Sequence, residues 1–179
     1  DRKRSIVSGI ETIEISEDTI PLVVGERTNV IGSRRFKKLI AQDEFEKAAE
    51  IGRRQARGGA HIIDVCMADP DREELDDILR FLPLLTRMVK IPLMIDSTDA
   101  VVLEEALKLC QGKSIINSIN LEDGEDRFET VVPLAKKYGA SLVVGCIDED
   151  PEDGMAVTVE RKLEIATRSH ELLTQKYSI

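Results

Sequence analysis

Several features that define common protein classes are missing from this sequence of 179 residues, which has no tryptophan, only 3% aromatic residues and three cysteines. Cys66, Cys110 and Cys146 lie far apart and form no CxxC pair, so we expect neither a disulfide framework nor a bound metal. No apolar run approaches the roughly 20 residues that cross a bilayer, and the charged start Asp1–Arg4 leads into no signal peptide. We therefore expect a soluble, cytoplasmic protein with no membrane partner.

The charge of the chain is acidic and evenly mixed. The formal net charge is −9 and the pI is near 4.9, while acidic and basic residues alternate without a long run of one sign. An acidic chain without clustered lysine and arginine is a poor partner for nucleic acid. With 42% apolar residues, the chain can bury the core of one folded domain.

Short apolar runs alternate with longer amphipathic stretches, which is typical of parallel strands joined by helices. Each run is apolar nearly throughout, as in strands that are covered on both faces. The five expected strands are Leu22–Gly25, His61–Met67, Leu93–Ser97, Ser114–Asn120 and Ser141–Asp148. Five units are too few for an eight-fold barrel of about 250 residues. The α/β chain is therefore either an open sheet or a truncated TIM barrel.

Caps and prolines delimit the expected helices. Asp43 and Glu46 are spaced as an N-cap pair, and Thr98 or Asp99 should cap the third helix. Pro83 should kink or interrupt the second helix, because proline removes a backbone donor.

Glycines predict where two helices end, and an apolar stripe predicts the buried face of the fifth helix. Glycines at Gly58-Gly59 and Gly139 should end two helices. The fifth helix should present a stripe of Leu163, Ala166, Thr167 and His170. Residues 1–20 read as a linker or an edge strand around Ile13-Glu14-Ile15.

Polar residues gather at the carboxyl ends of the expected strands, where parallel β/α folds carry their sites. On the third strand Met94 and Asp96 share one face, and Asn117 lies on the next strand. A carboxylate and an amide suit a flat heterocycle that presents an amino group, a ring N–H and a carbonyl. A pterin is such a ligand.

Three motifs at successive strand ends resemble the methyltetrahydrofolate-binding domain of cobalamin-dependent methionine synthase. They are Gly25–Ile40 (GERTNVIGSRRFKKLI), Met94–Thr98 (MIDST) and Gly112–Ile119 (GKSIINSI). The resemblance runs in register from about Pro21 to the end, so that 21–179 would be the N-terminal part of this pterin-binding domain.

The resemblance implies a barrel of the dihydropteroate-synthase type, a methyltransferase that binds 5-methyltetrahydrofolate as methyl donor. Its methyl group would pass to cob(I)alamin on a separate domain, and a further domain of the parent would bind homocysteine. By matched position Asp96 and Asn117 would hydrogen-bond the pterin, and the mouth would be lined by Asn29, Glu26, Arg27 and Asp148. Cys66 stands where relatives commonly have an asparagine.

Simpler roles stay open for the same residues. Asp96 could cap the following helix, Asn117 could satisfy loop backbone groups, and Glu26 with Arg27 could form an ion pair. The alternative functions are another pterin barrel, either dihydropteroate synthase or the methyltransferase of a corrinoid iron–sulfur protein, and a non-catalytic fragment. Five strands alone would leave apolar edges, so we expect self-association and no methyl transfer by this chain on its own.

Overall fold

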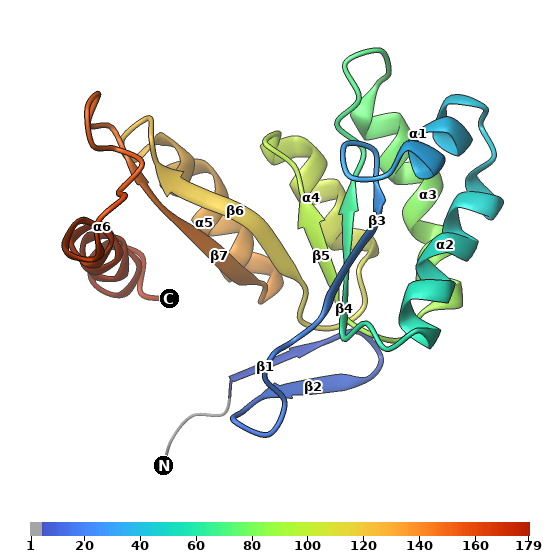
Figure 1. Cartoon of the computed structure of the whole chain (residues 1–179), viewed down its shortest axis with the longest axis horizontal. Helices are drawn as coiled ribbons and strands as arrows, with labels where there is room; N and C mark the ends of the chain where they lie inside the picture. Colours follow the sequence, from blue (N-terminus) through green and yellow to red (C-terminus); the bar gives the residue numbers. More distant parts are fainter. Residues whose placement is uncertain (1–4) are drawn as a thin grey trace. The chain divides into compact units, whose positions relative to one another are not determined.

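The computed structural model of the protein describes residues 5–179, which form two compact units with the division at Ile115/Ile116 (Figure 1). The first unit carries the motifs at Gly25–Ile40 and Met94–Thr98, and the division between the units falls in the middle of the motif Gly112–Ile119. Within residues 5–179, no helix is both long enough and apolar enough to cross a membrane.

Three parallel strands form the centre of the first unit, in the order β3 (Val24–Asn29), β4 (Ile62–Cys66) and β5 (Leu93–Asp96). Every residue of β4 is buried, as expected for a strand covered on both faces. β3 begins two residues later than predicted and extends to Asn29, with a register shift between Gly25 and Thr28. The extension places the polar segment Glu26–Asn29 inside the strand.

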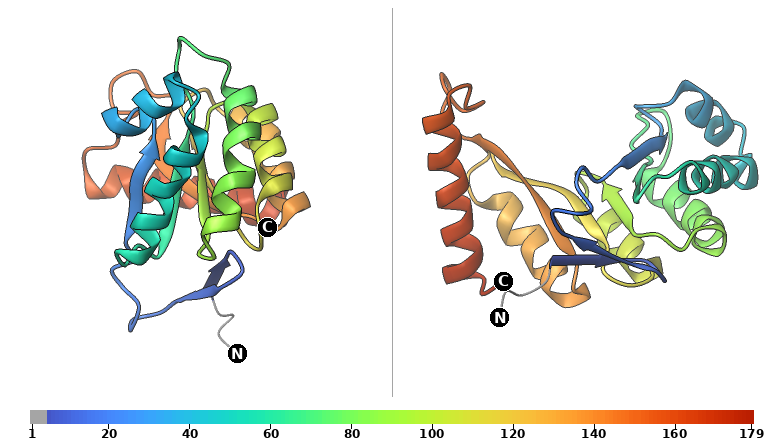
Figure 2. Two further views of the ribbon diagram at one scale, coloured as in Figure 1. Left: turned by 90° about the vertical axis from the view of Figure 1, so that its right-hand side faces the viewer. Right: turned by 60° about the horizontal axis from the view of Figure 1, so that its bottom comes forward.

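Four helices accompany these strands. They are α1 (Arg34–Ala41), α2 (Phe45–Arg57), α3 (Glu74–Met88) and α4 (Ala100–Leu109). Figure 2 shows α2, α3 and α4 side by side over one face of the strands. Phe36 of α1 meets Phe81 of α3 edge to face, with ring centroids 5.2 Å apart. α1, a helix of only eight residues, was not among the predicted helices.

Two predicted helix limits in this unit are wrong. Pro83 lies inside α3, which continues to Met88, because the buried Leu82 and Leu85 hold the helix on both sides of the proline. Asp43 does not cap α2; it adopts a left-handed φ of 55° and pairs with Arg72 and Arg80 at 2.9 Å each. Tertiary ion pairing thus replaces the predicted local cap.

β1 (Ser5–Ser8) and β2 (Thr12–Ile15) form an antiparallel hairpin. The hairpin is hydrogen-bonded to the loops that precede β5 and β6 (Ile115–Leu121). The Glu11 N–H donates to the Lys90 carbonyl at 2.9 Å, and the Ser8 N–H donates to the Lys113 carbonyl at 3.0 Å. The predicted strand at Ile13–Ile15 is confirmed, in a separate two-stranded sheet. The hairpin therefore belongs to the first unit.

The second unit continues the β/α alternation with neighbouring strands β6 and β7 (Ser141–Asp148) and helices α5 (Asp126–Tyr138) and α6 (Val159–Glu171). A short π-helix follows at Leu172–Lys176. α5 also runs through its proline, Pro133, and ends at Gly139 with a left-handed φ of 68°, as predicted.

The apolar stripe predicted for α6 is wrong. Leu163 is 62% exposed, whereas Ile165 and Ser169 are the buried residues of the helix. These two residues are four positions apart and therefore share one helical face. Because Ser169 is polar, a pattern of apolar residues does not reveal this face. The α/β class is confirmed in both units, and all the predicted strands except β3 agree with their predicted limits to within one residue.

Candidate functional site

The strand ends of the first unit bring one amide and two carboxylates together. Asn29 at the end of β3 donates from Nδ2 to Asp64 Oδ2 of β4 at 2.9 Å and lies 3.5 Å from Asp96 Oδ2 of β5. Asn29 and Asp64 are buried, and Asp96 is half-buried at the edge of the cluster. Two of the predicted site residues, Asn29 and Asp96, thus meet beside Asp64.

The Asn29 side chain is held in one orientation by its own loop. Its Oδ1 accepts from the Ile31 N–H at 2.8 Å and from the Gly32 N–H at 2.9 Å. Because the carbonyl oxygen is used in this way, the amide nitrogen must face the carboxylates of Asp64 and Asp96. The loop after β3 therefore sets the hydrogen-bonding pattern of the cluster.

The surroundings of the cluster are acidic. Burial raises the pKa of Asp96, and the charge of nearby Glu26 raises it further, against the hydrogen bond from Asn29. Burial likewise raises the pKa of Glu74, whose Oε1 is buried without a hydrogen-bond partner in residues 5–179. Acceptors in excess of donors suit a ligand that brings its own N–H groups.

The capping alternative for Asp96 is wrong. The residue that caps α4 is Asp99, whose Oδ1 accepts from the Val101 N–H at 2.7 Å and from the Val102 N–H at 3.3 Å. Asp99 is one of the two predicted caps, and its own N–H donates to Ser97 Oγ. Asp96 remains directed to the cluster with Asn29.

Glu26 and Arg27 do not form the ion pair that was considered for them within residues 5–179. Both side chains are exposed, and the Arg27 backbone N–H donates to Gln55 Oε1 of α2 at 2.7 Å. Only Glu26 influences the cluster, through its charge on Asp96. Arg27 instead lines a separate pocket beside α1 and α2.

Cys66 ends β4 as a buried thiol. Burial raises its pKa to about 12, so the sulfur stays protonated at neutral pH and cannot act as a thiolate ligand or nucleophile. Burial also raises the pKa of Cys110 to about 11. In the described part of the chain, no group of three or more metal-binding side chains occurs.

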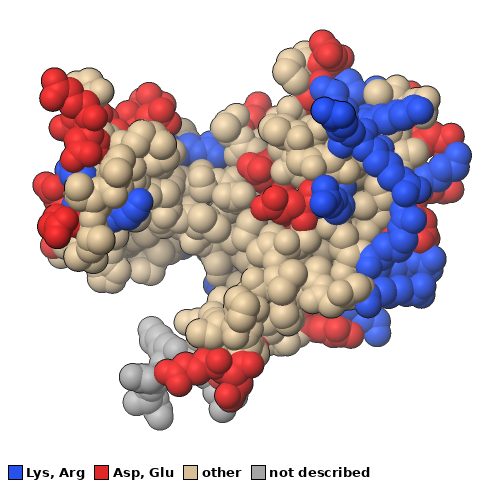
Figure 3. All heavy atoms as spheres, viewed as in Figure 1, with Lys and Arg blue, Asp and Glu red and all other residues tan. Residues whose placement is uncertain are grey.

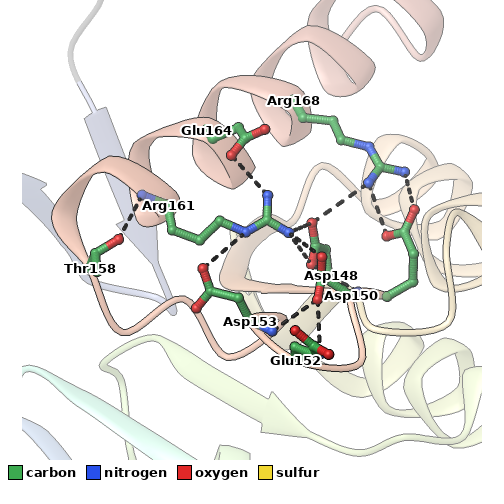
Figure 4. Close-up of polar contacts among 9 residues, drawn as sticks. Asp148, Asp150, Glu152, Asp153, Thr158, Arg161, Glu164 and Arg168 are labelled. Carbon is green, nitrogen blue, oxygen red and sulfur yellow. Dashed lines mark hydrogen bonds and ion pairs between the residues drawn. The ribbon is translucent and has the colours of Figure 1, made fainter.

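Asp148, at the end of β7 in the second unit, is engaged in a polar network (Figure 4). Arg161 of α6 donates from one Nη to both carboxylate oxygens, at 2.8 and 2.6 Å, and Arg168 lies 3.9 Å away. Asp148 Oδ1 also accepts from the Asp150 N–H at 3.2 Å. These contacts tie the carboxylate to the loop between β7 and α6. Its predicted place at the mouth of the pterin site stays a prediction.

Asn117 lies on β6 in the second unit and is half-buried between the buried Ile116 and Ile119. Its predicted contact with the pterin stays a prediction.

A family model described as "Pterin binding enzyme" matches residues 25–179. The chain belongs to the pterin-binding enzyme family. Its fold is similar to that of the dihydropteroate synthase of Thermus thermophilus, with a TM-score of 0.58 and 21% identity. That alignment covers 97% of this chain and 59% of the synthase, so the chain spans well under two thirds of that protein's length.

The structure brings two further carboxylates, Asp64 and Glu74, to the cluster at the strand ends. Asp64 and Glu74 were not among the predicted site residues, although each carries a carboxylate into the same acidic surroundings. A charged residue inside the apolar strand Ile62–Cys66 was the available signal for Asp64. Glu74 opens a helix and looks like an ordinary first-turn acid in the sequence.

Proposed function

We propose that this pterin-binding chain binds 5-methyltetrahydrofolate and presents its methyl group for transfer to cob(I)alamin on a neighbouring domain. The observation that supports the proposal is the Asn29–Asp64–Asp96 cluster, in which an amide donor of β3 and carboxylate acceptors of β4 and β5 meet at one end of the sheet. A pterin ring offers an amino group and a ring N–H to such acceptors. The motif Gly25–Ile40 favours the methionine synthase branch of the family.

The reaction sets a chemical requirement in addition to pterin binding. The methylated nitrogen is a poor leaving group unless a proton or a hydrogen bond stabilises the charge that develops as the methyl group departs. Asp96 is suited to hold the pterin by accepting its N–H groups in a partly desolvated place. Asn117 is proposed as the second pterin contact.

Dihydropteroate synthase is the second candidate, because the fold is similar to that enzyme and the acidic cluster would also hold the pterin of its product. The two functions differ in the pterin compound that the chain should prefer. A methyltransferase should bind 5-methyltetrahydrofolate more tightly than dihydropteroate, and a synthase should show the reverse order.

Equilibrium titration of the chain with 5-methyltetrahydrofolate, dihydropteroate and an unrelated heterocycle tests the proposal. We expect saturable binding of the methylated folate, with weaker binding of dihydropteroate and none of the unrelated compound. Preference for dihydropteroate would favour the synthase, and equal weak binding of all three would contradict a pterin site. Methyl transfer to cob(I)alamin must then be measured with the cobalamin-binding domain present.

A further inference from the structure

We propose that a second site, the arginine pocket beside α1 and α2, binds a small polyanion through its carboxylate or phosphate oxygens. The pocket has a volume of about 600 Å³. Its lining residues are Arg27, Gly32, Ser33, Arg34, Arg35, Ile51, Arg54 and Gln55. The pocket belongs wholly to the first unit.

The four arginines of the pocket are uncompensated by acids. Within residues 5–179, no carboxylate lies within ion-pair distance of Arg27, Arg34, Arg35 or Arg54, and all four are exposed. Arg53, the neighbour of Arg54 on α2, is by contrast paired with Glu50 at 2.8 Å. Four unpaired guanidinium groups around one cavity repel one another, and an anion would relieve that repulsion.

The surface around the pocket is basic, although the chain as a whole is acidic. The protein has a formal net charge of −9, yet Figure 3 shows lysine and arginine gathered along the side of this face where α1 and α2 lie in Figure 1. Such segregation produces a local potential that attracts anions in spite of the net charge. The pocket is the concave part of this basic surface.

The first residues of α1 belong to the lining of the pocket. Ser33 caps α1 through its Oγ, which accepts from the Phe36 N–H at 3.3 Å and fixes the start of the helix beside the pocket. Arg34 and Arg35 begin this helix, and both line the pocket. Guanidinium groups bind planar carboxylates and phosphates by paired N–H donors.

The loop after β3 connects the pocket to the Asn29–Asp64–Asp96 cluster. Gly32 lines the pocket, and a Cβ built on it would lie 3.6 Å from Asn29 Cβ, while the Ser33 N–H donates to the Asn29 carbonyl at 2.9 Å. The anionic groups can come from the glutamyl carboxylates of a folate or from a phosphate compound. Only the first assignment rests on the proposed function.

Calorimetric titration of the full chain with inorganic tripolyphosphate and with a γ-linked triglutamate peptide tests the proposal. Neither probe contains a pterin, so the result is independent of the folate proposal. We expect saturable binding of at least one probe that weakens with salt, and a loss of about 10-fold or more in the double variant Arg34→Gln, Arg54→Gln. The more tightly bound probe identifies the source.

Arg53→Gln is the matched control, because it removes the same charge one position away on α2 but from a side chain that is already paired. Its affinity should stay within about twofold of the parent, and Asp96→Ala should also leave the binding of both probes unchanged. Circular dichroism melting confirms that each variant is folded. The proposal is overturned if neither probe saturates, or if Arg53→Gln weakens binding as much as the double variant.

Discussion

Two carboxylates at the ends of parallel strands have opposite surroundings in this protein. Asp96 of β5 lies beside Asn29, Glu26 and Asp64, without a cation within ion-pair distance in residues 5–179, and burial raises its pKa. Asp148 of β7 is more deeply buried, yet Arg161 contacts both of its oxygens. Within residues 5–179, the same residue type at an equivalent place therefore has no cation partner in one unit and a bidentate arginine partner in the other.

The difference shows what a position at a strand end can and cannot indicate. Parallel strands bring their carboxyl ends to the same edge, but a partner from the following helix decides whether an acid there keeps its hydrogen-bonding capacity. α6 supplies Arg161 to Asp148, whereas α4 is capped by Asp99 and supplies nothing to Asp96. Three experiments sharpen or break this comparison.

The largest effect is expected for folate binding by Asp96→Ala. Pterin N–H groups would lose their acceptor in a partly desolvated site, at a cost of about 1–3 kcal/mol, or roughly 5- to 150-fold in the dissociation constant. Titration with 5-methyltetrahydrofolate measures it, and Glu26→Ala is the control with the smaller expected loss. Equal losses in the two variants would remove Asp96 from the site.

An intermediate effect is expected for stability in Asp148→Ala. Loss of a buried charged acceptor should lower the free energy of unfolding by about 2 kcal/mol. Glu164, on the exposed side of Arg161, is the control, and Glu164→Ala should cost no more than about 0.5 kcal/mol. Urea unfolding measures both, and folate affinity should stay within about twofold. A large loss of folate affinity in folded Asp148→Ala would instead place this residue in the folate site.

The smallest effect is expected for the stability of Asp96→Asn. This variant should be more stable than the parent, whereas Asp148→Ala should be less stable. Because the folded pKa of Asp96 is raised, the folded chain holds this proton more tightly, and ionisation costs stability as pH rises through the folded pKa. Asp96→Asn should therefore be slightly more stable than the parent at pH 7, with the gain disappearing below about pH 4. Thermal melting across this range tests it; a variant less stable at neutral pH would contradict the raised pKa.

The sequence by itself determined the β/α alternation, because buried strands and amphipathic helices leave periodic patterns in a single chain. The limits of β7, the cap at Asp99 and the left-handed Gly139 all follow from local chemistry and agree with the structure. The grouping of Met94 with Asp96 on one face of β5 was predicted for the same reason, and both are half-buried, whereas Leu93 and Ile95 on the other face are buried.

Tertiary structure alone decided what the acids and arginines do. Pro83 stays helical because Leu82 and Leu85 on either side of it are buried in the core, and Asp43 does not cap α2 because it pairs with Arg72 and Arg80 from elsewhere in the chain. Arg161 reaches Asp148 from thirteen residues away, and Arg27 and Arg54 line one pocket although they lie on different elements. Ion pairing and burial depend on distances in space, which the order of residues along the chain does not contain.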